Sequence, residues 1–458
     1  MKTEGRSLVT SDFGLLTSLP NNIINLVTLT KQLCFGDALF GQSYEIKLHI
    51  NGAENQKAKL AYYLGDKQYV EQTASFNKKG KLIFKGDKQL PTGIYMVILD
   101  NGYFDFLVDK EQNFSMSSDT SNFIANMKIS GSDENKLFFE YQVEVIGLKA
   151  RFEKIEKKIK LLDKKSDSLK LLKTQKQNIE DSVGNLWKKI VNNAPNSYLA
   201  KVLSAFNSRN INNFNLADPE MLRTPVYTNM LRLFIKKNIN KITPHIIFET
   251  RKLLDSLKPV EANYEYVANY LLNFYNTFYK IGMNEVFVFI ADNYFLPEKA
   301  SWFNKEQLSA INKRRNVLAQ SLVGEIAPKL VLEGSNGEFF SLHQIDAKFT
   351  ILYFWSSNCG HCTIATKALK NAYAKLQKKN IEVFAVNIDT DSTKWLKYIE
   401  DFDLQWINCQ DINAISGFRE KYYVYGSPLL FLLDNKKIIL SKQNGEVEIQ
   451  KLIEKLVD

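Results

Sequence analysis

The chain has 458 residues and a net charge of +10, and it is too long for one ordinary folding core. At about 150 residues per domain, this length predicts roughly three folding units. The composition, 45% hydrophobic and 24% charged, excludes disordered and collagen-like chains. The four cysteines, Cys34, Cys359, Cys362 and Cys409, are too few to brace three domains with disulfides, so any importance they have is local.

The positive charge is concentrated in one segment. Between Arg151 and Ile190 the sequence has 12 Lys/Arg and 6 Asp/Glu, which supplies +6 of the net +10. A charged helix face in water explains this pattern, and no phosphate-binding loop or nucleic-acid signature accompanies it. We therefore expect no binding to nucleic acid.

Residues 1–43 form a leader of undecided type. Its apolar stretch, Ile23 to Leu29, is short for a secretory signal, and Lys31 follows it. A degenerate signal segment and a disordered leader both remain open. Cys34 does not follow the small residues expected before a lipid-modified cysteine, which disfavours a lipid anchor. No stretch of about 18 apolar residues predicts a transmembrane helix.

Residues 44–132 show the pattern of an antiparallel sandwich or barrel, and we expect an antiparallel β-sandwich. Ile46, Leu48 and Ile50 alternate with polar residues before the turn at Asn51-Gly52. Turn residues separate the short apolar runs that follow, at Leu60 to Leu64, Leu82 to Phe84, Ile94 to Leu99 and Phe104 to Val108.

The hydrophobic pattern of residues 133–322 predicts an all-α domain. One helical seam of apolar residues ends before the polar stretch 164–168 and resumes after it, which favours a helical hairpin over one rod. The seam consists of Leu148, Phe152, Ile155, Ile159 and Leu162, and then Leu169, Leu172, Ile179, Val183 and Leu186. This domain is also a candidate surface for self-association.

Residues 323–458 alternate strands and helices. Strands are predicted at Phe349 to Phe354 and Ile381 to Ile388, and helices at Ile364 to Leu376 and Ser392 to Asp401. A hairpin formed by Leu429 to Leu433 and Ile438 to Ser441 precedes a closing helix at Glu446 to Val457. This order is typical of an α/β sheet covered on both faces.

Cys359-Gly360-His361-Cys362 lies between the first of these strands and the next helix. A cysteine at a helix N-terminus faces unpaired backbone N–H groups and the positive end of the helix dipole, which favour thiolate over thiol. The spacing lets the second sulfur close a disulfide with the first, so a substrate disulfide can be opened and resolved within one protein. An imidazole at His361 stabilises the reduced form and predicts a more oxidising couple than Pro would give there.

Two structural alternatives compete for this motif. A zinc site would need two further ligands, for which Cys409 and His343 are available, but neither belongs to a second paired motif. A structural disulfide would occur at this strand–helix junction only by coincidence. We therefore expect a redox-active pair, without metal or cofactor.

Residues 323–458 resemble the thioredoxin-like domain of the TlpA/ResA family of bacterial thiol:disulfide oxidoreductases. The stretches that carry the resemblance are Gly324 to Pro328, Phe354 to Cys362 and Val424 to Leu429. The resemblance implies that Cys359 is the nucleophile and Cys362 the resolving thiol, with Gly360 and His361 tuning the couple. It also implies that Pro428 is a cis-proline and that Ser427, Pro428 and Trp355 contact the substrate.

Three residues depart from the thioredoxin-like pattern. Tyr353 stands where thioredoxins keep a buried Asp that assists deprotonation of the resolving cysteine, so that proton path is absent or rerouted. Lys367 stands at the place of a helix-kinking Pro, and Ala365 at the place of an acidic residue in ResA-like members.

The leading functional hypothesis is an enzyme of the cell envelope or periplasm that exchanges disulfides with protein clients. A membrane or periplasmic thiol donor would then restore its dithiol. A thiol peroxidase of the peroxiredoxin superfamily is the second hypothesis, although Ser356 occupies the position three before Cys359. A binding or scaffolding protein with a vestigial redox domain is the third.

Overall fold

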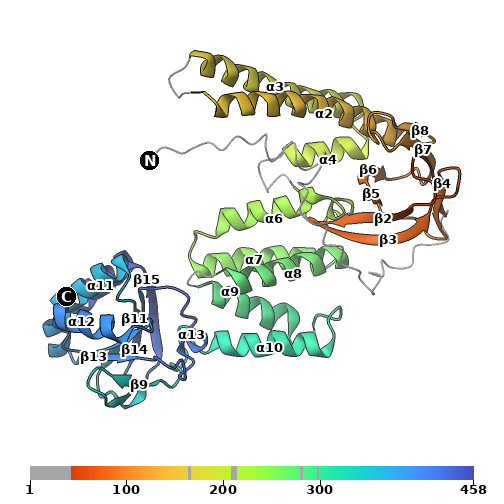
Figure 1. Cartoon of the computed structure of the whole chain (residues 1–458). Coiled ribbons are helices and arrows are strands. Elements are labelled where there is room, and N and C mark those ends of the chain that lie inside the picture. Colours follow the sequence, from red (N-terminus) through yellow and green to blue (C-terminus); the bar gives the residue numbers. More distant parts are fainter. Residues whose placement is uncertain (1–42, 163–166, 208–213, 279–281, 297–298) are drawn as a thin grey trace. The chain divides into compact units, whose positions relative to one another are not determined.

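The computed structural model describes residues 43–162, 167–207, 214–278, 282–296 and 299–458 (Figure 1). They form two compact units, the first comprising residues up to Asn240 together with Asp255–Tyr264. The second comprises Lys241–Leu254 and Glu265–Asp458. The leader, apart from residue 43, lies outside the described residues. Among the described helices, none is both long and apolar enough to cross a membrane.

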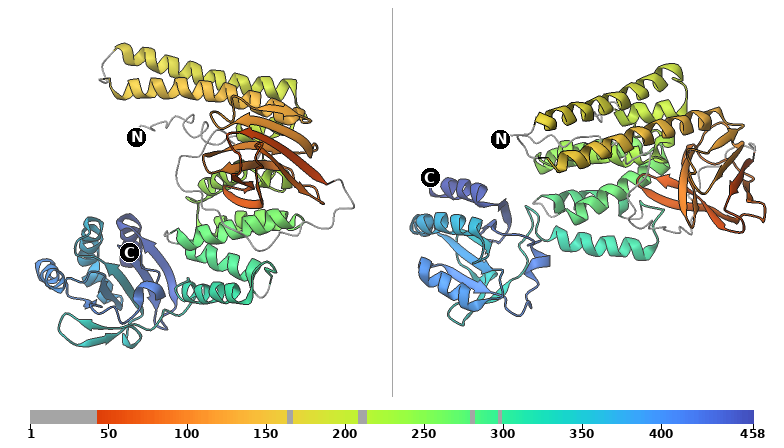
Figure 2. Two further views of the ribbon diagram at one scale, coloured as in Figure 1. Left: turned by 45° about the vertical axis from the view of Figure 1, so that its right-hand side comes forward. Right: turned by 45° about the horizontal axis from the view of Figure 1, so that its top comes forward.

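The first unit begins with two four-stranded sheets, ordered β4-β1-β7-β8 and β3-β2-β5-β6. Their strands are drawn in red to orange in Figures 1 and 2. Buried side chains from both sheets, such as Ile46, Phe84 and Phe106, belong to one hydrophobic core. The strands are β1 (Tyr44–Asn51), β2 (Lys57–Leu64), β3 (Lys67–Ser75), β4 (Lys81–Gly86), β5 (Gly93–Leu99), β6 (Gly102–Val108), β7 (Asn113–Asp119) and β8 (Lys128–Ser130).

Period-two alternation forms β1, whose residues Tyr44, Ile46, Leu48 and Ile50 are buried. The predicted turn follows at Gly52, which has a φ of +86°, and a Cβ there would lie 2.3 Å from Thr120 Oγ1.

The antiparallel prediction is wrong for one strand pair. β1 pairs with β7 in parallel, with Ile46 opposite Phe114 and Leu48 opposite Met116. The other pairings of these two sheets are antiparallel. Alternation shows which face of a strand is buried but not the direction of its neighbour, so the sequence pattern could not distinguish the two.

Helices follow the sheets. The side chain of Ser132 caps the first of them by accepting the Asn135 N–H at 3.2 Å. The helices that lie wholly in the first unit are α2 (Asp133–Lys160), α3 (Asp167–Asn193), α4 (Tyr198–Asn207), α5 (Pro219–Leu222) and α6 (Pro225–Asn238). α2 and α3 pack side by side, as expected for a helical hairpin, and Phe152 and Val183 of the predicted seam are buried (Figure 1).

The remaining helices before the last domain continue the helical segment. α7 (Thr243–Leu257) and α8 (Glu261–Thr277) have residues in both units, and the second unit continues with α9 (Met283–Ile290), π-helical η2 (Ala291–Phe295) and α10 (Lys305–Ala319). The helical segment is thus divided between the two units.

The second unit ends in a seven-stranded sheet ordered β10-β9-β13-β12-β11-β14-β15. Its strands are β9 (Val331–Gly334), β10 (Phe339–Ser341), β11 (Phe349–Trp355), β12 (Ile381–Asn387), β13 (Ile407–Gln410), β14 (Leu429–Asp434) and β15 (Ile439–Asn444). The helical elements between and after them are η3 (Leu342–Gln344), α11 (Gly360–Lys378), α12 (Ser392–Phe402), α13 (Phe418–Lys421) and α14 (Glu446–Val457). The strands and helices predicted for this part of the sequence are confirmed.

This sheet has a hydrophobic core on each face, which accounts for the continuous apolar run of β11. Ile351 and Tyr353 belong to the core that includes α11 and α14. Leu352 and Phe354 belong to the other core, which includes Phe418 of α13. β11 is therefore an interior strand covered on both faces, and α11 begins shortly after its carboxyl end.

Candidate functional site

Cys359 is the N-cap residue of α11. Its backbone is extended (φ −106°, ψ 117°), and its Sγ accepts the backbone N–H of Cys362 at 3.2 Å. Its side chain is half-buried, whereas that of Cys362 is fully covered. The helix start thus directs one of its unpaired N–H groups at the sulfur that a partner can reach, as the sequence predicts.

Cys362 lies one turn into the helix, in the core beneath α11. Burial, together with a hydrogen bond to Cys359, raises the pKa of the Cys362 thiol from 9.0 to about 12. The structure contains both residues as free thiols. The pair is therefore asymmetric, with an accessible first sulfur and a protected, protonated second one.

The segment before β14 lies against the first sulfur. The Ser427-Pro428 peptide bond is cis. The Cys359 thiol donates to the Ser427 carbonyl with an Sγ to O distance of 3.7 Å. The cysteine motif and Ser427-Pro428, far apart in the sequence, meet at one site as the resemblance implies.

His361 projects outward from the first turn of α11, with 71% of its side chain exposed. Its Nδ1 lies 3.1 Å from Oε1 of Glu446, the first residue of α14. The pKa of Glu446 is lowered by a hydrogen bond to its own backbone and by the one from His361. Glu446 was not predicted, because nothing in the sequence shows that the start of the closing helix meets the start of α11.

Gly360 begins α11, and the space around it is open: a Cβ there would have no neighbour within 4 Å. The structure thus shows no steric reason for glycine at this position.

Trp355 requires a correction. Only 1% of its surface is exposed, and its ring packs between Tyr353 and Tyr398, with centroid distances of 6.5 and 4.9 Å. A client cannot contact a ring covered in this way. Trp355 therefore belongs to the packed core next to the site and not to the client-binding surface. The sequence could not show this, because the covering residue Tyr398 comes from α12, about forty residues later.

Tyr353 fills the place expected for a buried carboxylate. Its hydroxyl donates to the Cys362 carbonyl at 3.2 Å and shares a 3.1 Å hydrogen bond with Thr366 Oγ1. Burial raises the pKa of the Tyr353 hydroxyl well above 10. Tyr353 therefore holds the first turn of α11 as a neutral group.

The other two departures lie on α11 as well. Ala365 is buried in the core, whereas Lys367 is exposed, with its Nζ 5.7 Å from the centre of the Phe402 ring.

Cys409 lies on β13 in the core on the other face of the sheet from Cys362. It is fully buried, and burial raises the pKa of its thiol to about 12. Cys409 therefore does not compete with Cys359 for exchange. Among the described residues, no three His, Cys, Asp or Glu side chains form a group that could hold a metal ion.

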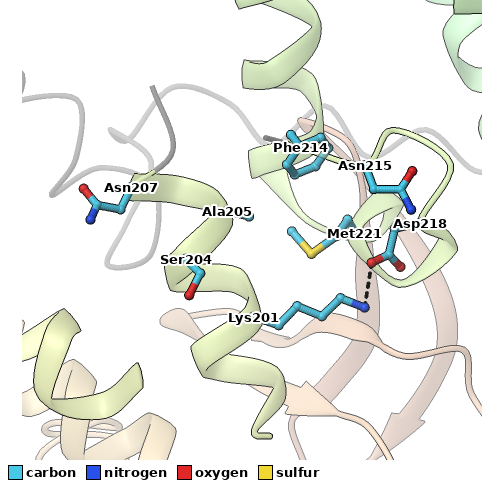
Figure 3. Close-up of a pocket in the computed structure, with 8 residues that line it drawn as sticks. All are labelled: Lys201, Ser204, Ala205, Asn207, Phe214, Asn215, Asp218 and Met221. Atoms are coloured by element: carbon cyan, nitrogen blue, oxygen red, sulfur yellow. Dashed lines mark ion pairs between the residues drawn. The ribbon is translucent and has the colours of Figure 1, made fainter. Parts of the chain in front are cut away.

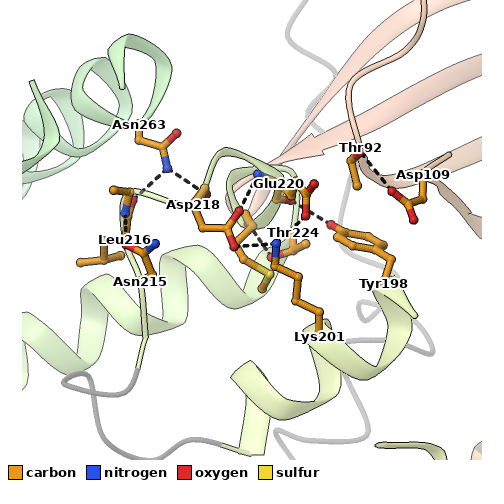
Figure 4. Close-up of polar contacts among 12 residues, drawn as sticks. Thr92, Asp109, Tyr198, Lys201, Asn215, Leu216, Asp218, Glu220, Thr224 and Asn263 are labelled. Carbon is orange, nitrogen blue, oxygen red and sulfur yellow. Dashed lines mark hydrogen bonds and ion pairs between the residues drawn. The ribbon is translucent and has the colours of Figure 1, made fainter. Parts of the chain in front are cut away.

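A pocket of about 480 Å³ in the first unit is a second place to look for a site (Figure 3). Lys201 lines it and forms ion pairs with Asp218, at 2.6 Å, and Glu220 (Figure 4). Asn263 of α8 donates to the carbonyls of Leu216 and Asp218 at 2.8 and 3.0 Å. Two carboxylates already neutralise the pocket's lysine, and the polar contacts hold the chain around Asp218 in place. The remaining lining residues are Ser204, Ala205, Asn207, Phe214, Asn215 and Met221. The cysteine pair is therefore the better candidate site.

Comparisons with known proteins agree with this choice. A family model described as thioredoxin-like matches residues 346–439, and a model for a domain of unknown function (DUF4369) matches residues 44–138. The thiol-disulfide oxidoreductase ResA of Geobacillus thermodenitrificans is 31% identical over 133 residues, which are 27% of this chain and 72% of the relative. A Helicobacter pylori relative whose name places it among the peroxiredoxins is 30% identical over 121 residues, 26% of this chain and 77% of the relative.

A solved structure is also similar to part of this chain. A domain of a possible thiol-disulfide isomerase from Cytophaga hutchinsonii is similar with 34% identity and a TM-score of 0.27, covering 29% of this chain and 92% of that one. Through its carboxy-terminal thioredoxin-like domain, the chain belongs to the ResA-like family of thiol-disulfide oxidoreductases.

Proposed function

We propose that Cys359 and Cys362 exchange disulfides with protein clients, with Cys359 as the nucleophile and Cys362 as the resolving thiol. The observation that carries the proposal is the placement of the Cys359 sulfur. It is the more exposed of the pair, accepts a helix N–H and lies next to the Ser427 carbonyl.

The first step opens the client disulfide. The Cys359 thiolate attacks one client sulfur, forming a mixed disulfide, and the other client sulfur leaves as a thiolate that takes up a proton. Cys362 then loses its proton and attacks the Cys359 sulfur, which releases the second client thiol. The client gains two electrons and two protons, and the enzyme pair becomes a disulfide. The reverse sequence oxidises a client dithiol.

Ser427 and Pro428 lie at the border of the surface on which an extended client segment would bind. Ser427 is half-buried beside Cys359, and the Pro428 carbonyl accepts the Gly445 N–H at 3.1 Å, which fixes this segment to the end of β15. His361 and Gly360 are the residues that tune the couple, since the imidazole stands on the first turn with Glu446 as its partner.

The remaining assignments extend the same proposal. We place the enzyme in the cell envelope or periplasm, where a membrane or periplasmic thiol donor returns the pair to the dithiol form. Residues 44–132 as a β-sandwich domain and 133–322 as an all-α domain would select clients or form a homo-oligomer, and residues 323–458 carry the chemistry.

Reduction of insulin disulfides by the full chain with dithiothreitol tests the exchange. Cys359→Ser should abolish catalysis, whereas Cys409→Ala should retain it, because Cys409 lies in the other core. Cys362→Ser should accumulate mixed disulfides with clients in an extract of the source cells. Equal activity of the wild-type chain and Cys359→Ser would refute the mechanism.

Peroxide reduction is the second candidate, and the relative named as a peroxiredoxin favours it. In that reaction the Cys359 thiolate would attack a peroxide oxygen, releasing an alcohol or water and leaving a sulfenic acid for Cys362 to condense with. Consumption of hydrogen peroxide with dithiothreitol, at a rate exceeding insulin reduction, would support this alternative. Client capture that needs residues 44–320 and neither cysteine would instead support a scaffold.

A further inference from the structure

One carboxylate oxygen accepts hydrogen bonds from every residue of the loop that precedes Cys359. Asp389 Oδ2 accepts hydrogen bonds from Ser356 Oγ at 2.8 Å, Ser357 N at 2.9 Å, Ser357 Oγ at 3.0 Å and Asn358 Nδ2 at 3.3 Å. Hydrogen bonds to an ionised acceptor are about twice as strong as neutral ones. All three residues between β11 and the nucleophile are therefore attached to one atom.

Asp389 is itself held by the sheet. It stands two residues beyond β12, and its carbonyl accepts Gln410 Nε2 at 2.7 Å. Gln410 ends β13 opposite Asn387 and accepts a hydrogen bond from Ser392 Oγ of α12 at 2.9 Å. Asp389 thus lies just beyond the carboxyl end of β12, where Gln410 of the neighbouring parallel strand β13 holds its backbone.

The loop controls where the nucleophile stands. Ser356 is almost covered, its Oγ accepts the Asn358 N–H at 3.1 Å, and its carbonyl accepts the Cys359 N–H at 3.3 Å. A change in the loop therefore moves Cys359 relative to the Cys362 N–H and the Ser427 carbonyl. Reactivity is sensitive to such movement, since a misplacement of about 1 Å can cost on the order of a hundredfold in rate.

We propose that Asp389 is a positioning residue for disulfide exchange, whose carboxylate fixes residues 356–358 so that the Cys359 sulfur stays on the helix N–H. This inference rests on the proposed role of Cys359 as nucleophile. The cysteine motif does not predict a role for Asp389, because Asp389 lies thirty residues beyond Cys359. It reaches the site only through the pairing of β11 with β12.

A positioning role and a purely electrostatic role for Asp389 predict opposite changes in the alkylation of Cys359. If Asp389 acted on Cys359 only through its charge, its removal would make the thiolate easier to form and alkylation faster at a given pH. If it positions the loop, its removal separates the sulfur from the N–H group, so the thiolate forms at higher pH and alkylation slows. The other titratable groups that interact with Cys359, which are Cys362, Tyr353 and Tyr398, stay unchanged in the variants.

The test compares Asp389→Ala and Asp389→Asn with Asp391→Asn in the full reduced chain. Asp391 is a matched control, since it also carries a carboxylate in this segment but caps α12 by accepting the Lys394 N–H at 3.1 Å. The pH dependence of Cys359 alkylation by iodoacetamide is followed by peptide mapping, and insulin reduction is measured beside it. Thermal unfolding of each variant sets a temperature at which all are folded.

The expected result is a shift of the Cys359 alkylation profile to higher pH in Asp389→Ala, with insulin reduction slowed by about tenfold or more. Asp389→Asn keeps one acceptor oxygen and should show a smaller shift in the same direction, while Asp391→Asn should match the wild type. An unchanged profile, or one shifted to lower pH, in both Asp389 variants would overturn the positioning role. Alkylation needs no client, so this readout stands even if the wild-type chain fails to reduce insulin.

Discussion

Alkylation of the reduced chain should label Cys359 far ahead of Cys362 and Cys409, the other two cysteines that the structure describes. Burial raises the pKa of the Cys362 and Cys409 thiols from 9.0 to about 12. A raised thiol pKa means that the thiolate appears only at higher pH. Near pH 7.5, each of these residues holds about a thousandfold less thiolate than an ordinary cysteine, and only the thiolate reacts. Covered sulfur atoms slow the reaction further.

The assay is exposure of the dithiothreitol-reduced full chain to iodoacetamide near pH 7.5, with peptide mapping at successive times. Cys359 should be labelled first and completely, before label appears on Cys362 or Cys409. Cys409 is the matched control, since it is equally buried but lies on the other face of the sheet from α11. In denaturant all three should react at similar rates, because burial is lost.

Labelling of Cys362 at a rate close to that of Cys359 in the folded chain would refute this reasoning. It would mean that the second thiol is reached and ionised without a client. The asymmetry that assigns the nucleophile and the resolving thiol would then be absent.

Two further substitutions test buried polar groups. Burial raises the pKa of Asp105 from 3.8 to about 7, so the charged carboxyl destabilises the folded chain increasingly as pH rises from about 4 to 7, by up to about 4 kcal/mol. Asp105→Asn should remove this loss in calorimetric scans across that range, and an identical pH dependence in the variant would contradict it. Tyr353→Phe removes the hydroxyl that bonds the Cys362 carbonyl and Thr366, so it should cost about 1 kcal/mol of unfolding free energy and leave insulin reduction largely intact. Lost activity at unchanged stability would instead place the Tyr353 hydroxyl in the proton path of Cys362.

The carboxy-terminal elements were predictable because their signals are local. A continuous apolar run predicts a central strand buried on both faces, and β11 is such a strand. In the first unit β3, β7 and β8 were missed. β7 is mostly polar, with three Ser among its seven residues, although its alternating burial at Phe114, Met116 and Ser118 is typical of a strand.

The residues of the site also differ in how local their sequence signals are. Cys359, Cys362 and the helix N–H that meets the first sulfur all lie in one short segment, so the sequence determined them together. Ser427 and Pro428 came from a resemblance, and the structure brings the Ser427 carbonyl next to Cys359.

The sequence by itself determined which residues can do the chemistry, because a cysteine pair at a strand–helix junction is a local pattern. The tertiary structure decided what surrounds them. Asp389 and Glu446 reach the site because β12 pairs with β11 and α14 packs on α11, whereas Trp355 is removed from contact with a client by Tyr398. Strand pairing and helix packing join residues thirty to ninety positions apart, and a hydrophobic pattern records which face is buried but not which neighbour covers it.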